Sequence, residues 1–329
     1  MDGDFADKLA RRRLYSHAAE SDAGTALPDY LAAHFKRFDR AGWVEAAEAG
    51  LVAVNGVTAS PETILKRHDR VEYFPPDAPE PDAELHFRTV YADDDLLVLD
   101  KPGNLCVHPT GPVFRHTLWH LAGQTYGELR VVHRIDRETS GLVAAARTRR
   151  AAAAMDNGAT PVHKEYLALV TGDFRGRVHA EGYLVHDRDS AIAKKKRFIF
   201  AGTPEAAEAA SDPTAETAVT ELVEESHLPQ DMTLVRATLG TGRQHQVRAT
   251  LHSLGFPLAG DKLYGPDERL FLKIRDGALT VDDMRLLRFP RQALHAAVLE
   301  FRHPFSGEPL RFESPFPDDL LTTAPSRNH

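Results

Sequence analysis

A stiff, proline-rich stretch divides this chain into two regions of unlike pattern. Residues 75–82 read Pro-Pro-Asp-Ala-Pro-Glu-Pro-Asp, and a polar, aperiodic run of this kind is typical of a linker between domains. The chain has 329 residues, which is more than one average domain needs. We therefore expect a flexible tail at residues 1–26, a small module at 27–75, a linker at 76–86, a large domain at 87–320 and a short tail at 321–329.

The region before the linker combines two short helical patterns with a hairpin. Residues 27–35 carry apolar side chains at helical spacing, and Asp39 is placed as the N-cap of a second helix. Residues 51–54 then read as a strand, Asn55-Gly56 as a two-residue hairpin turn, and residues 71–74 as a returning strand. This order predicts a small α/β module.

The region after the linker is rich in short runs of strand length with a few helices between them. The apolar runs lie at residues 89–91, 96–99, 130–132, 142–144, 166–170 and 232–235, and helices are expected at 148–157 and 244–254. We therefore expect an α+β domain built on a mixed, mostly antiparallel sheet. Residues 194–214, basic and then rich in Ala, Glu and Pro, are treated as a loop that reads the substrate.

Composition narrows the class of protein. No window approaches the roughly 18 consecutive apolar residues of a membrane span, and the start lacks the apolar core of a signal peptide, so we expect a cytoplasmic protein without membrane contact. Cys106 is the only cysteine, which excludes a disulfide framework and a thiolate metal site. The net charge of −8 is unusual for a protein that binds phosphates, but local clusters decide such binding. Basic clusters occur at residues 11–13, 36–37, 66–67 and 194–197.

The strongest chemical signal is a polar loop between two apolar runs. Residues 131–142 place Asp136 in this loop, with Arg134 and Arg137 on either side. Rigid flanks would present the carboxylate at a sheet edge, and cations within about 4–6 Å would keep it ionised. The same pattern also describes a surface ion pair, so the loop alone leaves the role of Asp136 open.

The loop His-Arg-Ile-Asp-Arg-Glu-Thr-Ser-Gly-Leu is similar to the signature loop of the RluA family of RNA pseudouridine synthases. Further stretches resemble the other motifs of that family, and they follow in the correct order. They are residues 91–103 for the opening hairpin, 164–168 for the second motif, 242–248 with 260–265 for the third, and 294–296 with 303–304 for the closing strands. The module at 27–75 resembles the alpha-L RNA-binding module first known from a ribosomal protein.

The resemblance implies an enzyme that uses neither a cofactor nor a metal. It cleaves the glycosidic bond of a uridine in RNA, turns the base and rejoins it through carbon 5. Asp136 would be the catalytic carboxylate, either as a nucleophile or as a base at the ribose. Tyr166 would pack on the uracil and help to remove the proton from carbon 5, and Arg248 would pair with Asp136.

The resemblance also implies residues that bind the substrate. Arg134, or alternatively Arg137, would fill the stack that the flipped nucleotide leaves, and Val247 would line the uracil pocket while Lys164 supports it. Thr250 and Phe256 depart from the pattern, since relatives commonly carry histidine there, and this puts local packing in doubt. The remaining expected substrate-binding positions are His133, Arg243 and Gln246.

The target and two rival functions stay open at this point. RNA is the expected partner of a monomer that binds no nucleotide cofactor, and the module favours ribosomal over transfer RNA. One rival is an inactive RNA-binding protein on the same fold that serves ribosome assembly. The other is a metal-dependent hydrolase, suggested by 17 histidines and the run Asp93–Asp95. The second is disfavoured because the His-Asp pairs at residues 68–69 and 186–187 lack a helical partner at the spacing of a zinc site.

Overall fold

The computed structural model describes residues 9–156 and 160–321, which form two compact units divided between Pro81 and Asp82. This division falls inside the expected linker at 76–86. Parts of three expected segments lie outside the described residues, namely 1–8 of the first tail, the helix end at 157 and 322–329 of the last tail. Within the described residues, no helix has the length and apolar character that a membrane crossing requires.

The first unit contains a four-stranded sheet and two short helices. The elements are β1 (Leu14–His17), α2 (Leu27–His34), α3 (Arg40–Glu48), β2 (Val52–Val54), β3 (Val57–Thr58) and β4 (Arg70–Tyr73), and the strand order is β1-β4-β2-β3. Asp39 is the N-cap of α3 and accepts a hydrogen bond of 2.9 Å from the backbone nitrogen of Gly42. Asn55 and Gly56 both have positive φ angles, as a tight hairpin between β2 and β3 requires.

The predicted tail at residues 1–26 is wrong for its described part. Residues 14–17 form strand β1, which pairs antiparallel with β4, and Ala18 is buried in the core of the unit. The sequence gives little sign of this strand because it lies at the edge of the sheet with most of its side chains exposed. Backbone pairing holds it, so an alternating apolar pattern is not needed.

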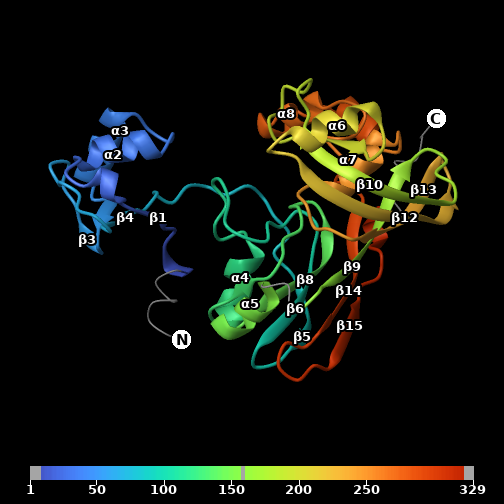
Figure 1. Ribbon diagram of the computed structural model, residues 1–329, viewed down its shortest axis with the longest axis horizontal. Helices are drawn as coiled ribbons and strands as arrows, with labels where there is room; N and C mark the ends of the chain where they lie inside the picture. The colour runs from blue at the N-terminus through green and yellow to red at the C-terminus, as the bar shows by residue number, and fades with distance from the viewer. Residues whose placement is uncertain (1–8, 157–159, 322–329) are drawn as a thin grey trace. The chain divides into compact units, whose positions relative to one another are not determined.

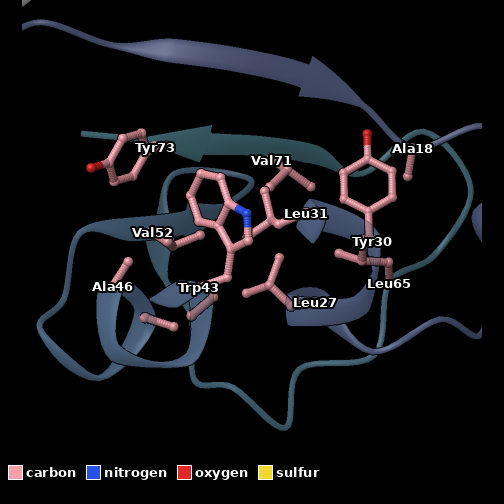
Figure 2. Packing of buried hydrophobic residues seen from close by; sticks show 12 residues of the cluster. Ala18, Leu27, Tyr30, Leu31, Trp43, Ala46, Val52, Leu65, Val71 and Tyr73 are labelled. Carbon is pink, nitrogen blue, oxygen red and sulfur yellow. The ribbon is translucent and has the colours of Figure 1, made fainter. Parts of the chain in front are cut away.

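Trp43 organises the core of the first unit (Figure 2). Its side chain is almost fully buried and packs with Leu31, Val52 and Val71 from both helices and the sheet. The ring of Tyr73 meets it edge to face, with 5.1 Å between the ring centroids. This cluster gives the unit a core of its own.

The second unit is an α+β domain on one large sheet, as predicted. The strands are β5 (Arg88–Ala92), β6 (Leu96–Lys101), β7 (Arg130–Val131), β8 (Ser140–Ala146), β9 (His163–Thr171), β10 (Arg177–His186), β11 (Lys196–Phe200), β12 (Glu216–Leu228), β13 (Met232–Leu239), β14 (Leu294–Arg302) and β15 (Pro309–Glu313). The main path runs β11-β10-β12-β13-β9-β14-β8-β6-β5, with β15 beside β14 and β7 beside β8. Only the pair β14–β8 is parallel among the described strands, so the sheet is mixed and mostly antiparallel.

Helices cover this sheet at two places (Figure 1). They are α4 (Leu118–Tyr126), α5 (Arg149–Asp156), α6 (Pro204–Ser211), α7 (Gln246–Ser253), α8 (Arg269–Arg275) and α9 (Val281–Leu287). The near-continuous apolar runs of β6 and β8 are explained by burial on both faces, because α4 packs on one side and α5 on the other. The segment 194–214 is not a loop as expected, since it contains the whole of β11 and of α6.

The register of the sheet brings distant motifs into one row. Ala296 of β14 lies opposite Gly141 of β8 on one side and opposite Tyr166 of β9 on the other. Gly141 has a φ of +107°, and a Cβ added there would lie 2.3 Å from the carbonyl oxygen of Ala296. Only glycine allows β8 and β14 to approach this closely, so Gly141 sets the position of the loop that carries Asp136.

Candidate active site

Asp136 is held by one of its two carboxylate oxygens. Its Oδ2 accepts hydrogen bonds from Nη1 of Arg248 at 2.6 Å and from Nε2 of Gln292 at 3.4 Å. Its Oδ1 accepts no hydrogen bond from any residue that the structure describes, and Nε2 of His245 lies 3.9 Å from it. The carboxylate therefore has one anchored oxygen and one free oxygen.

Arg248 links this carboxylate to a second, deeper one. The guanidinium of Arg248 donates from Nε and Nη2 to the two oxygens of Asp261, at 2.7 and 2.9 Å. Asp261 is completely buried, and its Oδ1 also accepts from the backbone nitrogens of Leu263 and Tyr264 at 2.9 Å each. This bidentate contact fixes the orientation of Arg248, which in turn fixes Asp136.

The electrostatics of this chain keep Asp136 ionised. Burial by itself would raise the pKa of Asp136. The charge of Arg248, a smaller contribution from His245 and the hydrogen bonds from Arg248 and Gln292 together outweigh burial and lower the pKa to about 2. Burial would likewise lower the pKa of Arg248, and its two carboxylate neighbours raise it above its ordinary value instead. At neutral pH the site therefore holds a charged acid beside a charged arginine.

Tyr166 and Lys164 lie on the same face of β9, because strand side chains two residues apart point the same way. Tyr166 is 7% exposed and belongs to the apolar cluster that contains Val247 and Ile135. Burial and the charge of Asp136 raise the pKa of Tyr166 above its ordinary value, so its hydroxyl stays protonated. The pKa of Lys164 is lowered by burial, and its ammonium has no hydrogen-bond or ion-pair partner in the described part of the chain.

Comparison with known proteins identifies the family. A family model described as RNA pseudouridylate synthase matches residues 95–253. Ribosomal large subunit pseudouridine synthase D of Xanthomonas campestris is 33% identical over 92% of this chain and 88% of its own length. The chain belongs to the RluA-type family of RNA pseudouridine synthases. The protein of the same name from Vibrio vulnificus is 31% identical over 94% of this chain and 92% of its own length.

The fold of the synthase also has a solved counterpart. Human RNA Pseudouridylate Synthase Domain Containing 1 superposes with a TM-score of 0.53 at 24% identity, over 72% of this chain and 86% of that one. The expected fold and the expected enzyme class are thereby confirmed: this chain is a pseudouridine synthase, an isomerase that acts on uridines in RNA.

Arg134 and Arg137 are the two candidates to fill the gap that the flipped nucleotide leaves in the RNA stack. They differ in how many contacts their side chains make with the rest of the fold. Arg137 is tied to the fold, because its Nε donates to the side chain of Asn104 at 2.9 Å and its Nη2 donates to the carbonyl of Asp82 at 2.6 Å. Arg134 is exposed and makes no hydrogen bond or ion pair with the residues that the structure describes. Of these two arginines beside Asp136, only Arg134 therefore has a side chain that is not held by the described residues.

The prediction that Gln246 binds substrate needs correction. Both hydrogens of its amide are used, at 2.9 Å each, on the carbonyl of Val219 and the hydroxyl of Thr220. Its oxygen accepts from the backbone nitrogen of Arg243 at 3.0 Å and from the hydroxyl of Thr241 at 2.8 Å. All four hydrogen-bonding positions of the amide are occupied, so Gln246 holds the start of α7 in place and offers nothing to RNA.

Three further residues, His133, Val247 and Arg243, were predicted to bind the substrate. His133 is neutral, because burial lowers its pKa to about 3, and its Nε2 accepts from the backbone nitrogen of Ala144 at 3.2 Å. Val247 is buried in the cluster of Tyr166. Arg243 is exposed, and its Nε donates to the carbonyl of Thr217 at 3.2 Å. Phe256, which departs from the family pattern, packs edge to face on Phe174.

Sequence reasoning missed the residues that support the site. Asp261 and Lys101 both lie in motifs noticed in the sequence, but no role was given to them. Lys101 is fully buried and donates to the carbonyls of Pro102 and Arg137 at 2.7 and 3.1 Å, so it supports the chain directly after Asp136. Gln292 carries no sequence signal beyond its place two residues before the closing strand motif.

The structure gives no support to the alternative function of a metal-dependent hydrolase. The described residues contain no group of three His, Cys, Asp or Glu side chains arranged to hold a metal ion. Asp93, the first of the acidic run, instead caps the turn between β5 and β6 by accepting from the backbone nitrogens of Asp95 and Leu96 at 2.8 and 2.7 Å. The acidic run thus has a structural explanation.

Proposed function

We propose that this synthase modifies ribosomal RNA with Asp136 as its catalytic carboxylate, and that it works as a cytoplasmic monomer without a cofactor. The ribosomal target is supported by the names of the relatives, since several are called ribosomal large subunit pseudouridine synthase D. The role of Asp136 is supported by one observation above all. Its Oδ2 is anchored on an arginine that a buried carboxylate fixes, while Oδ1 is left free.

The proposed reaction begins with the target uridine turned out of its stack. Asp136 acts on the ribose through Oδ1, and the bond between C1′ and N1 breaks with its electron pair passing to uracil. The base then turns, a bond forms between C1′ and C5, and the proton on C5 leaves while N1 gains one. Arg134 fills the vacated stack, because its guanidinium is exposed and untethered whereas that of Arg137 is not. Unstacking costs a few kcal/mol, which a planar cation in the gap partly offsets.

Tyr166 is proposed to support the base and to assist the loss of the C5 proton. Since burial and Asp136 raise its pKa, a phenolate is disfavoured, and the hydroxyl acts through hydrogen bonding to water or to the base. We expect Tyr166→Phe to slow single-turnover tritium release from RNA labelled at uridine C5 by at least about 100-fold. The free energy of unfolding in urea should change by less than about 1 kcal/mol, because the hydroxyl has no partner within the described residues. An unchanged rate would remove Tyr166 from the mechanism.

The first unit is proposed to bind RNA through a local basic surface. Arg12 and Arg37 are close in space, since after burial the charge of Arg37 is the main cause that lowers the pKa of Arg12. The guanidinium of Arg37 lies 5.4 and 5.5 Å from the rings of Phe38 and Tyr73, and that of Arg11 lies 4.5 Å from the ring of Phe74. Cations interleaved with aromatic rings suit both the phosphates and the bases of single-stranded RNA.

The RNA target can be tested by mapping pseudouridines in total RNA from a strain that lacks the gene. We expect one or more pseudouridines to vanish from large-subunit ribosomal RNA and to return when the wild-type gene is restored. Restoring the Arg37→Gln variant should return them less completely, and its RNA affinity should fall less steeply with salt. Loss confined to transfer RNA would overturn the ribosomal target, and full rescue with unaltered salt dependence would overturn the role of the first unit.

A further inference from the structure

His245 lies at the end of a hydrogen-bond chain that determines which ring nitrogen carries its proton. The backbone nitrogen of Lys196 donates to the phenolic oxygen of Tyr264 at 2.9 Å, and this oxygen lies 3.1 Å from Nδ1 of His245. Tyr264 is fully buried, so its hydroxyl hydrogen needs an acceptor, and Nδ1 is the only one in reach among the described residues. Nδ1 therefore accepts, and the single proton of the neutral ring sits on Nε2.

The surroundings keep this ring neutral. Burial, and then the charge of Arg248, lower the pKa of His245 to about 4, against the opposing charges of Asp136 and Asp261. Lys194 is the remaining charged group that acts on the ring, and it lowers the pKa further. Over the physiological pH range Nε2–H is thus a permanent donor whose direction is fixed by Tyr264.

This donor has no hydrogen-bond acceptor among the residues that the structure describes. Nε2 lies 3.9 Å from Oδ1 of Asp136, which is too long for a hydrogen bond. The backbone of His245 is also left-handed, with φ of 59° and ψ of 15°, a conformation that costs residues other than glycine some strain. An unused donor on a strained residue beside the reactive oxygen points to a contact that forms only with substrate.

We propose that Nε2–H of His245 donates a hydrogen bond to O2 of the target uracil as the glycosidic bond breaks. Three oxygens of uridine lie near C1′, namely O4′, the 2′-hydroxyl and O2. The electron pair of the broken bond spreads from N1 onto O2, whereas O4′ loses electron density as the sugar gains oxocarbenium character. A fixed donor accelerates the reaction only where negative charge grows, and this selects O2. The inference rests on the proposed role of Asp136 at the ribose.

Two substitutions of His245 separate the donor from the rest of the side chain. Asn tolerates the left-handed backbone but ends near the position of Nδ1, whereas the longer Gln can place an amide nitrogen near Nε2. We expect His245→Asn to slow single-turnover conversion of ribosomal RNA from the deletion strain by roughly 100-fold, with RNA affinity changed less than about threefold. His245→Gln should recover at least about tenfold of that loss. Equal rates for His245→Asn and the wild type would overturn the proposal.

The contact with O2 is tested with synthetic RNA that carries 2-thiouridine at the target, because sulfur is a weaker acceptor than oxygen. The wild-type enzyme should be slowed by the sulfur several times more than His245→Asn is. Equal slowing of both enzymes would show that His245 does not touch O2 and would overturn the proposal even if His245→Asn is slow. If the wild type failed to convert unmodified RNA while folded and bound, the proposed function would fail before this inference is reached.

Discussion

Asp136→Asn should leave a folded protein that binds RNA but converts uridine at least about 1,000-fold more slowly. The substitution keeps the shape of the side chain and an oxygen that can accept from Arg248, and it removes only the charge that acts on the ribose. The bidentate contact between Arg248 and Asp261 is untouched, so the protein should stay folded, and the thermal unfolding transition should fall only by the contribution of the lost Asp136 charge. Single-turnover tritium release from RNA labelled at uridine C5, at saturating enzyme, measures the effect without interference from binding.

Asp94→Asn is the matched control for this experiment. Asp94 is exposed in the turn between β5 and β6, and the same change of acid to amide there should leave the rate unaltered. An Asp136→Asn enzyme that keeps a tenth of the wild-type rate would contradict the catalytic role. Tritium release that stays at background for the wild type on several RNAs would instead favour the inactive RNA-binding alternative for this particular chain.

Arg248→Met should both destabilise the protein and abolish turnover. It removes the only cation that touches Asp261 within the described residues, and Asp261 is 0% exposed, so a buried charge loses its compensation. Breaking a buried ion pair from one side costs about 3–5 kcal/mol of unfolding free energy. Urea unfolding measures this loss, and Arg177→Met, at an exposed position on β10, should cost less than about 0.5 kcal/mol.

The double variant Arg248→Met/Asp261→Asn tests the cause of that loss. If the lone buried carboxylate is responsible, removing its charge should restore part of the stability while turnover stays absent, because Asp136 still lacks its anchor. A double variant less stable than Arg248→Met would contradict this explanation. An Arg248→Met protein that is as stable as the Arg177→Met control would also contradict this explanation.

Much of the fold could be predicted from local pattern. Apolar runs bounded by turn residues located β5, β6, β7, β8, β9 and β13 of the catalytic unit, but not β10, β11, β12 or β15. Asp39 and Asn55-Gly56 marked a helix start and a hairpin in the first unit. Strand β1 was not predicted, because an exposed edge strand needs no alternation of apolar and polar residues. The order of strands along the large sheet was not predicted either, since no local sequence pattern indicates that β14 pairs with β8 and β9.

The site was predictable only where the resemblance supplied it. Asp136 and Arg248 are 112 residues apart, and no spacing rule connects them. Once the family motifs paired them, the deeper Asp261 still went unassigned, because a buried acid in a loop looks like a turn residue in sequence. Gln246 shows the opposite error, since its place in a motif suggested substrate contact while its amide is occupied by the fold.

The catalytic role of Asp136 requires that Arg248 keep its carboxylate ionised in the free enzyme. The sign of the effect is defined: the folded pKa of about 2 lies below the ordinary value of 3.8, so the ionised pair stabilises the fold above about pH 4 and this contribution is lost as pH falls toward 2. The direct measurement is the carbon-13 shift of the Asp136 carboxyl against pH, assigned by its disappearance in Asp136→Asn. We predict a carboxylate that stays fully ionised from pH 7 down to pH 4. A midpoint at pH 4 or above would contradict the account.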